Sequence, residues 1–247
     1  TMDSAKGIAV VGRSDHTIKE LMGDLANINP FVPLPHETYP MIAVPTTFGT
    51  GSEVIRNAVI SDSDGHKMVP MHDCILPAYA VCDPDLAATL PPRVAAAAAM
   101  DALVQAAEAY VSLAANDFSE TMSLRAIELI GPHIVPYYHD RSVLEHADAL
   151  CKGSMYAGIA WNNSFVAQIH ASNHPITELL HIPHGEACAI LFPPFVEYNG
   201  EACREKFRKV HNLMYPDAWL GREAFEPGIL VHKLVQLNRD LNIMDGK

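Results

Sequence analysis

The pattern of apolar and polar positions divides the chain near Pro91–Pro92 into two parts with different periods. Before this point the apolar residues form short runs bounded by proline, glycine and aspartate, which is typical of strands in an α/β fold. The pattern predicts a helix at residues 1–11, strands at residues 41–45, 54–60 and 78–82, and a turn at residues 62–65. Residues 1–91 are therefore predicted to form an α/β part.

From Pro92 onward the apolar positions recur at helical spacing. In the alanine-rich stretch 93–114, Leu103, Ala106 and Tyr110 belong to one apolar stripe. Further helices are predicted at residues 119–130, 144–159, 186–198, 200–214 and 228–241. No repeat or low-complexity linker interrupts this pattern, so residues 92–247 are predicted to be all-helical.

The composition narrows the classes of function. With 49% hydrophobic and 19% charged residues, the chain is neither disordered nor fibrous. Acidic residues outnumber basic ones 29 to 17, which argues against a nucleic-acid partner because phosphate binding needs Lys and Arg. The five cysteines form no C-x-x-C pair, which suits a reducing cytoplasm. With no basic leader and no stretch that approaches a membrane span, we expect a cytoplasmic protein without a membrane partner.

The segment 168–186 is dense in histidine and is the first candidate for chemistry. His170 and His174 lie four residues apart and would share one helix face, whereas His184 lies at a helix boundary between a proline and a glycine; His181 is the fourth histidine. Imidazole nitrogen is a common ligand of divalent transition metals, so the segment predicts a metal site that needs an acidic ligand from elsewhere. For each residue alone, a packed core histidine stays the alternative.

Asp101 is the acidic residue that such a site requires. It lies in a nearly charge-free helical run. Burying an unpaired carboxylate there would destabilise the protein by roughly several kcal/mol unless a cation lies beside it. Gln105 is four residues further on and faces the same way. One carboxylate from this helix and imidazoles from another would make a mixed oxygen and nitrogen site. A simple cap or salt bridge at Asp101 is the open alternative, and Gln105 could be a bystander.

The loop TTFGTGSE at residues 46–53 is a candidate for phosphate binding. Its glycines allow tight or left-handed backbone, and its hydroxyl groups could donate hydrogen bonds to phosphate oxygens. The loop has no Walker lysine, so an ordinary turn is an equally good interpretation of this motif alone.

Together these motifs resemble one family. The order PTTFGTGSE, DPDLAATLPP, AMDALVQAAEAY and IHASNHPITELLHIPHGEACAILFP is similar to that of the iron-containing, or group III, alcohol dehydrogenases. The resemblance implies a dinucleotide-binding α/β domain at residues 1–91, followed by a helical metal and substrate domain at residues 92–247, in a dehydroquinate synthase-like architecture. It also implies iron(II), or zinc in some members, a nicotinamide cofactor and a homodimer.

The resemblance assigns roles to individual residues. It implies metal ligation by Asp101, His170 and His184, with Gln105 at the position of a further ligand, and it places His174 beside the nicotinamide as a proton relay. The residues that it places at the cofactor are Thr46, Thr47, Gly49, Thr50, Gly51, Ser52 and Lys67.

Two departures from the family pattern stand out. The family motif D-A-L-T-H reads D-A-L-V-Q here, so Gln105 replaces a histidine, and a neutral amide is a poorer ligand than imidazole. The family also carries a strand-helix-strand unit and a G-G-G-S turn before residue 1, and closing helices after residue 247. We therefore expect the chain to be incomplete at both ends.

The resemblance implies hydride transfer between a small alcohol or aldehyde and NAD or NADP, a choice that the sequence leaves open. The alternatives are a glycerol-like polyol dehydrogenase, a maleylacetate-type reductase, or a truncated and divergent homologue without catalytic activity. A metal-dependent hydrolase is less well supported, because the chain lacks an H-E-x-x-H motif.

Overall fold

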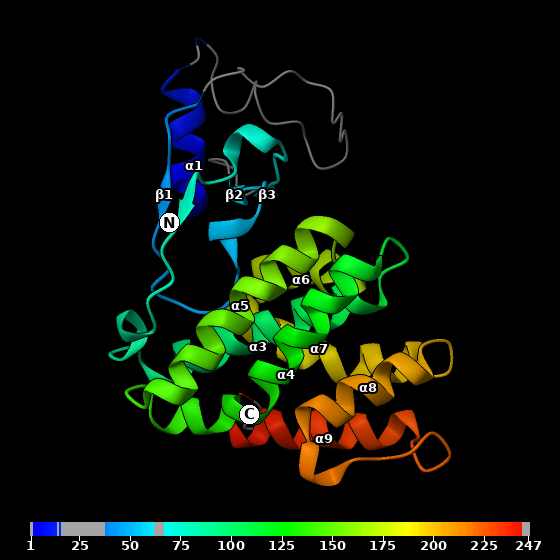
Figure 1. The fold of residues 1–247 in the computed structure, drawn as a ribbon. Helices are drawn as coiled ribbons and strands as arrows, with labels where there is room; N and C mark the ends of the chain where they lie inside the picture. The colour runs from blue at the N-terminus through cyan, green and yellow to red at the C-terminus, as the bar shows by residue number, and fades with distance from the viewer. Residues whose placement is uncertain (1, 14, 16–37, 62–66, 244–247) are drawn as a thin grey trace. The chain divides into compact units, whose positions relative to one another are not determined.

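The computed structural model describes residues 2–13, 15, 38–61 and 67–243 (Figure 1). The predicted turn at residues 62–65 and the side chains of Lys67 and His174 lie outside this description. The chain forms two compact units, of which the first comprises Thr1–Pro45 with Ser52–Cys82 and the second Thr46–Gly51 with Asp83–Lys247. The domain boundary at Pro91–Pro92 stays a prediction, since compactness alone does not define a domain.

Among its described residues, the first unit contains a helix, two pairs of very short strands and two 3-10 turns. Its elements are α1 (Met2–Val11), β1 (Ile42–Ala43), η2 (Ser52–Val54), β2 (Ile60–Ser61), β3 (Lys67–Met68), η3 (Asp73–Ile75) and β4 (Tyr79–Ala80). Strands β1 and β4 pair in parallel, with Ile42 opposite Tyr79, and β2 pairs with β3 antiparallel. Val10 of α1 packs on Ala58 and Ile75 to form a small core. The predicted helix and the predicted strands at residues 41–45 and 78–82 are therefore present, each strand shortened to two residues.

The strand predicted at residues 54–60 is wrong over most of its length. The segment begins as the end of η2, Asn57 forms an isolated antiparallel bridge with Met71, and Ile60 alone joins a strand. The physical reason is the buried Lys6, whose Nζ donates to the carbonyl oxygens of Ile55 and Asn57, each at 2.8 Å. These carbonyls are bonded to a side chain of α1, so they do not form a ladder with a neighbouring strand.

The second unit is helical, as predicted. Its elements are η4 (Pro84–Ala87), α3 (Pro92–Val111), α4 (Asp117–His139), α5 (Leu144–Ser164), α6 (Gln168–Leu180), α7 (His184–Asn199), α8 (Arg204–Met214), η5 (Pro216–Ala218) and α9 (Pro227–Asp240). Helix α3 contacts α4, α5, α6, α7 and α8, so it is the central helix of this unit (Figure 1). Its alanines let these neighbours approach closely, because a small side chain keeps helix axes near each other.

The expectation that no stretch approaches a membrane span is wrong for helix α3. Among the helices in the described part of the chain, it is the one that is long and apolar enough to cross a membrane, by length and composition only. In the structure 78% of its most apolar window is buried. Burial to this degree is what the central helix of a helical unit shows.

Two glycines bring other segments onto α3. A Cβ atom on Gly185, in the first turn of α7, would lie 1.9 Å from the carbonyl oxygen of Ala97. A Cβ on Gly49, in the loop at residues 46–51, would lie 2.9 Å from the carbonyl oxygen of Ala98. Because neither contact leaves space for a side chain, the start of α7 and the glycine-rich loop both rest directly on the α3 backbone.

Candidate metal centre

Three predicted site residues from three helices converge in the second unit. Asp101 lies near the middle of α3 and is 5% exposed. Its Oδ1 is 3.3 Å from Nε2 of His170 on α6 and 3.5 Å from Nε2 of His184, the first residue of α7. The two imidazole rings have centroids 5.4 Å apart. The structure thus brings together the carboxylate and the two imidazoles that the sequence predicts as partners.

The charges in this cluster are strongly coupled. Burial by itself would raise the pKa of Asp101, but His184 and His170 outweigh burial and hold that pKa well below its usual range. Burial likewise lowers the pKa of His170, while the adjacent Asp101 and Glu108 raise it to about 9. Without a metal, His170 therefore carries a proton between two carboxylates. A divalent cation could supply the same positive charge in place of that proton.

Glu108 is a site residue that the sequence interpretation missed. It is fully buried on α3, and its carboxylate accepts hydrogen bonds from the backbone N–H of Ile169, at 2.6 Å, and from Nδ1 of His170. Because Ala167 at the N-cap of α6 provides no side-chain cap, Glu108 performs that function from another helix. Its position, two turns after Asp101 on the same helix, was the available signal.

Cys188 is a second residue that the sequence interpretation missed. It lies one helical turn after His184 on α7, and its Sγ is 3.8 Å from both Asp101 Oδ1 and His184 Nε2. The Nδ2 atom of Asn173 donates to this sulfur at 2.9 Å. One ligand atom each from Asp101, His170, His184 and Cys188 can be chosen so that all four lie within 4.8 Å of one another. Burial raises the pKa of Cys188, so it is a thiol in the absence of metal.

The remaining predicted residues of the histidine-rich region have different surroundings. Gln105 is buried, and its Nε2 has no hydrogen-bond partner within the described part of the chain, so its role as a ligand stays a prediction. His181 caps the C-terminus of α6 in a left-handed conformation and is exposed. The backbone of His174 belongs to α6, but its proposed relay role concerns a side chain outside the description.

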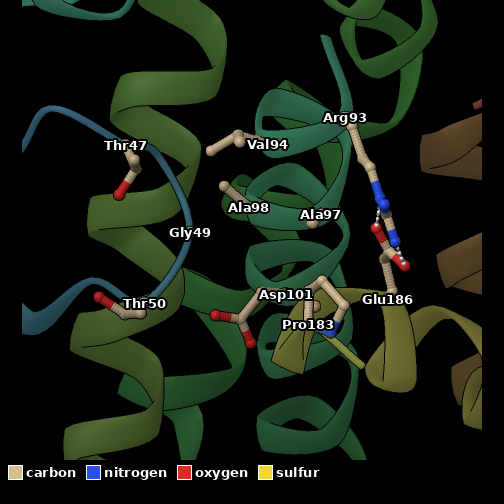
Figure 2. Close-up of a pocket in the computed structure, with 11 residues that line it drawn as sticks. Thr47, Gly49, Thr50, Arg93, Val94, Ala97, Ala98, Asp101, Pro183 and Glu186 are labelled. Atoms are coloured by element: carbon tan, nitrogen blue, oxygen red, sulfur yellow. Dashed lines mark hydrogen bonds and ion pairs between the residues drawn. The ribbon is translucent and has the colours of Figure 1, made fainter. Parts of the chain in front are cut away.

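A pocket of about 360 Å³ opens beside the candidate metal-binding side chains, and Asp101 forms part of its wall (Figure 2). Its lining residues are Thr47, Gly49, Thr50, Arg93, Val94, Ala97, Ala98, Asp101, Pro183, Gly185 and Glu186. Arg93 and Glu186 form a two-point ion pair, with N–O distances of 2.5 and 2.9 Å. This volume lies in the range of small-molecule sites.

Three predicted cofactor residues, Thr47, Gly49 and Thr50, line this pocket. Gly51 ends the same loop with a φ of 62°, a left-handed conformation that favours glycine. The hydroxyl of Ser52, in the first unit, donates to Asp3 Oδ1 at 2.5 Å, so it has a structural partner there. Thr46 begins the loop, and the side chain of Lys67 is not described. The cofactor roles of all these residues stay predictions.

The donor atoms of Asp101, His170, His184 and Cys188 are suited to a divalent transition metal. A carboxylate oxygen, two imidazole nitrogens and a nearby sulfur are the donors that iron(II) and zinc prefer. Asp101 and Cys188 are buried and the two histidines are partly buried, so uncompensated negative charge at Asp101 is costly. The loop beside them, with its glycines and threonine hydroxyls, likewise fits a phosphate-bearing cofactor.

Comparisons with known proteins identify the family. The model of the "Fe-containing alcohol dehydrogenase family, C-terminal" matches residues 95–246, and the "Iron-containing alcohol dehydrogenase" model matches residues 1–84. The chain belongs to the iron-containing alcohol dehydrogenase family. The resemblance that the motifs suggested is thereby confirmed.

Individual members of the iron-containing alcohol dehydrogenase family show how much of the fold is shared. The probable alcohol dehydrogenase EutG of Salmonella typhimurium is 35% identical over 213 residues, which are 85% of this chain and 51% of EutG. A crystal structure of 1,3-propanediol oxidoreductase has a TM-score of 0.88 at 30% identity, covering 98% of this chain and 62% of the other.

Sulfoacetaldehyde reductase from Bifidobacterium kashiwanohense, in complex with NAD+, has a TM-score of 0.85 at 26% identity, over 99% of this chain and 62% of the other. These similarities confirm the predicted fold class, an α/β part followed by a helical part. The chain spans about half the length of the curated relatives that it matches first.

Proposed function

We propose that this chain carries the metal site of a metal-dependent alcohol dehydrogenase that transfers a hydride between a small alcohol or aldehyde and NAD or NADP. One observation carries the proposal. Oxygen and nitrogen donors of Asp101, His170 and His184 converge in the second unit, and Asp101 forms part of a pocket that a threonine- and glycine-rich loop also lines.

In this proposal Asp101 Oδ1, His170 Nε2 and His184 Nε2 hold iron(II) or zinc. When bound, the metal supplies Lewis-acid polarisation of the substrate oxygen. Glu108 prepares His170 for ligation, because an Nδ1–H that donates to the carboxylate leaves the Nε2 lone pair free to face Asp101. Gln105 is proposed as a weak additional donor, in line with the sequence prediction.

The cofactor would lie against the loop that begins at Thr46. Thr47, Gly49 and Thr50 line the pocket, and we propose that they, with Gly51, Ser52 and Lys67, contact its phosphates and ribose. NAD+ in the sulfoacetaldehyde reductase complex supports a nicotinamide cofactor. His174 is proposed to pass the proton of the alcohol toward solvent.

The substrate class rests on the relatives. EutG is named a probable alcohol dehydrogenase, which supports an alcohol or its aldehyde as the substrate. The structural similarity to 1,3-propanediol oxidoreductase favours a short diol as the second candidate. A homodimer and a cytoplasmic location stay predictions from the sequence.

The test is a hydride-transfer assay on the 247-residue protein loaded with iron(II) without oxygen, or with zinc. Oxidation of NADH or NADPH is followed with acetaldehyde, propionaldehyde and 3-hydroxypropionaldehyde as substrates. We expect turnover that a chelator removes and added metal restores. A protein that holds one metal ion per chain and binds reduced cofactor, yet oxidises neither cofactor with any aldehyde, would contradict the proposal and favour the non-catalytic alternative.

A further inference from the structure

The metal cluster contains one donor that the proposed function does not use, the sulfur of Cys188. We propose that Cys188 is the fourth protein ligand of this site, so that the metal is held by one carboxylate, two imidazoles and one thiolate. This inference rests on the proposed metal site and goes beyond it, because it changes which metals the site prefers.

The distances between donors fit a shared ion. With metal–ligand bonds of about 2.0 to 2.3 Å, neighbouring donors of a tetrahedral site lie about 3.3 to 3.8 Å apart. Asp101 Oδ1 lies 3.3 Å from His170 Nε2 and 3.5 Å from His184 Nε2. The sulfur of Cys188 lies 3.8 Å from Asp101 Oδ1 and from His184 Nε2. These four separations lie within that range, and all four donors lie within 4.8 Å of one another, so small side-chain adjustments would let them share one ion.

The helix geometry holds the sulfur in this place. His184 and Cys188 are separated by one turn of α7, so their side chains leave the helix on the same face. The close contact of Gly185 with the backbone of Ala97 sets how near that face comes to α3 and therefore to Asp101. The position of Cys188 relative to Asp101 thus follows from helix packing and does not depend on a mobile loop.

The surroundings of the sulfur also differ from those of an apolar filler. Asn173 is fully buried, and its Nδ2 donates both to the carbonyl oxygen of His184, at 3.0 Å, and to Sγ of Cys188, at 2.9 Å. An N–H group that donates to sulfur stabilises a metal-bound thiolate, as outer partners of metal ligands commonly do. A cysteine that only filled space would need no such donor.

Gln105 makes a sulfur ligand useful at this site. Its amide is a weak neutral donor, so the carboxylate and the two imidazoles are the strong oxygen and nitrogen ligands available. A thiolate restores a fourth strong ligand, and the thiol gives up its proton to solvent as the metal binds. Because thiolate is a soft donor, the site should favour zinc over iron(II) more than a site of oxygen and nitrogen ligands does.

The experiment is cobalt(II) substitution followed by absorption spectroscopy. The parent, Cys188→Ser and Cys203→Ser proteins are loaded with cobalt(II), and metal content is measured on the same samples. Cys203 is also a free cysteine of the second unit, at the start of α8, and is the matched control. Circular dichroism verifies that each variant keeps its helices.

We expect a thiolate-to-cobalt charge-transfer band in the near ultraviolet for the parent and for Cys203→Ser. Cys188→Ser should still bind cobalt, about 10-fold or more weakly, without this band. The ratio of zinc to iron(II) affinity should also fall in this variant. Because a folding defect would weaken both metals alike, the ratio reports on the sulfur itself.

Two results would overturn the proposal in distinguishable ways. Cobalt bound to the parent without a thiolate band, or a band that survives in Cys188→Ser, would remove Cys188 from the site and leave the proposed function intact. A parent protein that binds neither cobalt nor zinc would overturn the metal site itself and the sulfur ligand with it.

Discussion

Each unit buries a charged side chain, and the two burials differ in how the charge is met. Lys6 on α1 is 2% exposed, and its Nζ donates to two main-chain carbonyl oxygens. Asp101 on α3 is 5% exposed, and its Oδ1 faces imidazole nitrogens and a sulfur. The partners of Lys6 are backbone carbonyl groups, so Lys6 holds the loop around residues 55–57 in place. The neighbours of Asp101 can themselves bind a metal, so Asp101 belongs to a candidate metal site.

The comparison has a general lesson about interpreting buried charge. A buried charge is costly wherever it lies, and its cost alone does not show whether it serves structure or chemistry. The two cases differ in the groups around the charge. Around Lys6, carbonyl oxygens satisfy the charge by hydrogen bonding. Around Asp101, the neighbouring groups are further metal-ligand atoms that could bind the same ion. Substitutions in the two units should therefore have different effects, on metal affinity around Asp101 and on stability around Lys6.

Substituting His184→Ala should weaken zinc and iron(II) binding by more than about 100-fold, because it removes a direct ligand. The helical content should stay nearly unchanged, since α7 is held by apolar packing. Competitive chelator titration with circular dichroism measures both quantities. His181→Ala, an exposed histidine at the end of α6, is the control. Equal affinities for the His184→Ala and parent proteins would remove this residue from the site.

Substituting Glu108→Gln should weaken metal binding by about 10- to 100-fold, as for other groups that orient a ligand histidine. The amide keeps an acceptor for Nδ1 of His170 but loses the charge that favours this orientation. Nitrogen NMR of the His170 ring gives an independent readout, because it reports which nitrogen carries the proton. Glu128→Gln on α4, exposed and paired with Arg125, is the matched control. Unchanged affinity and an unchanged ring spectrum would make Glu108 a helix cap only.

Substituting Gln105→His should tighten metal binding by at least about 10-fold, or roughly 1.4 kcal/mol, because imidazole is a stronger donor than an amide. Dissociation constants for iron and zinc from competitive chelator titration provide the measurement. If the constants of the variant and the parent are equal, Gln105 does not reach the metal and its difference from the family motif is incidental.

We expect a smaller effect from Lys6 in the first unit, a pH dependence of the protein's stability. Burial lowers its pKa from 10.5 to about 8, although Asp3 and Glu53 act in the opposite direction. Between these two pKa values the unfolded chain binds more protons than the folded chain, so this group makes the protein more stable as the pH rises through 8. Below pH 8 the buried charge keeps its full cost.

Through Lys6, the free energy of unfolding should increase by about 1 kcal/mol from pH 8 to pH 9. It is measured as the difference between the parent and Lys6→Met proteins in urea unfolding followed by circular dichroism. The exposed Lys152, paired with Asp148, gives the control variant Lys152→Met. A difference that does not change over this pH range would mean that Lys6 is not desolvated in the folded protein.

The sequence predicted the metal cluster better than it predicted the groups around it. A carboxylate in an apolar run and a histidine-rich segment are local signals that pointed to Asp101 and to residues 168–186. The family resemblance then selected His170 and His184 among the histidines of that segment. Glu108 could not be assigned in the same way, since its partners on α6 are brought to it by packing. The same holds for residues 54–60, where bonds to Lys6 leave only an isolated bridge in place of the expected strand.

Helix ends were the other weak point of prediction. The sequence predicts a helix at residues 119–130, but α4 begins at Asp117 and continues through Pro132 and Pro136 to His139. A proline removes one helical hydrogen bond, and packing of α4 against α3 and α5 outweighs that loss. Such compensation depends on residues far away in the sequence, so local patterns do not reveal it.

Anomalous diffraction from crystals of the zinc- or iron-loaded protein, recorded at the absorption edge of the metal, tests the proposed metal site most directly. We expect one strong peak in the second unit, about 2.0 to 2.2 Å from Asp101 Oδ1, His170 Nε2 and His184 Nε2. A peak bound by other residues, or none at this position in crystals of protein shown to contain metal, would contradict it.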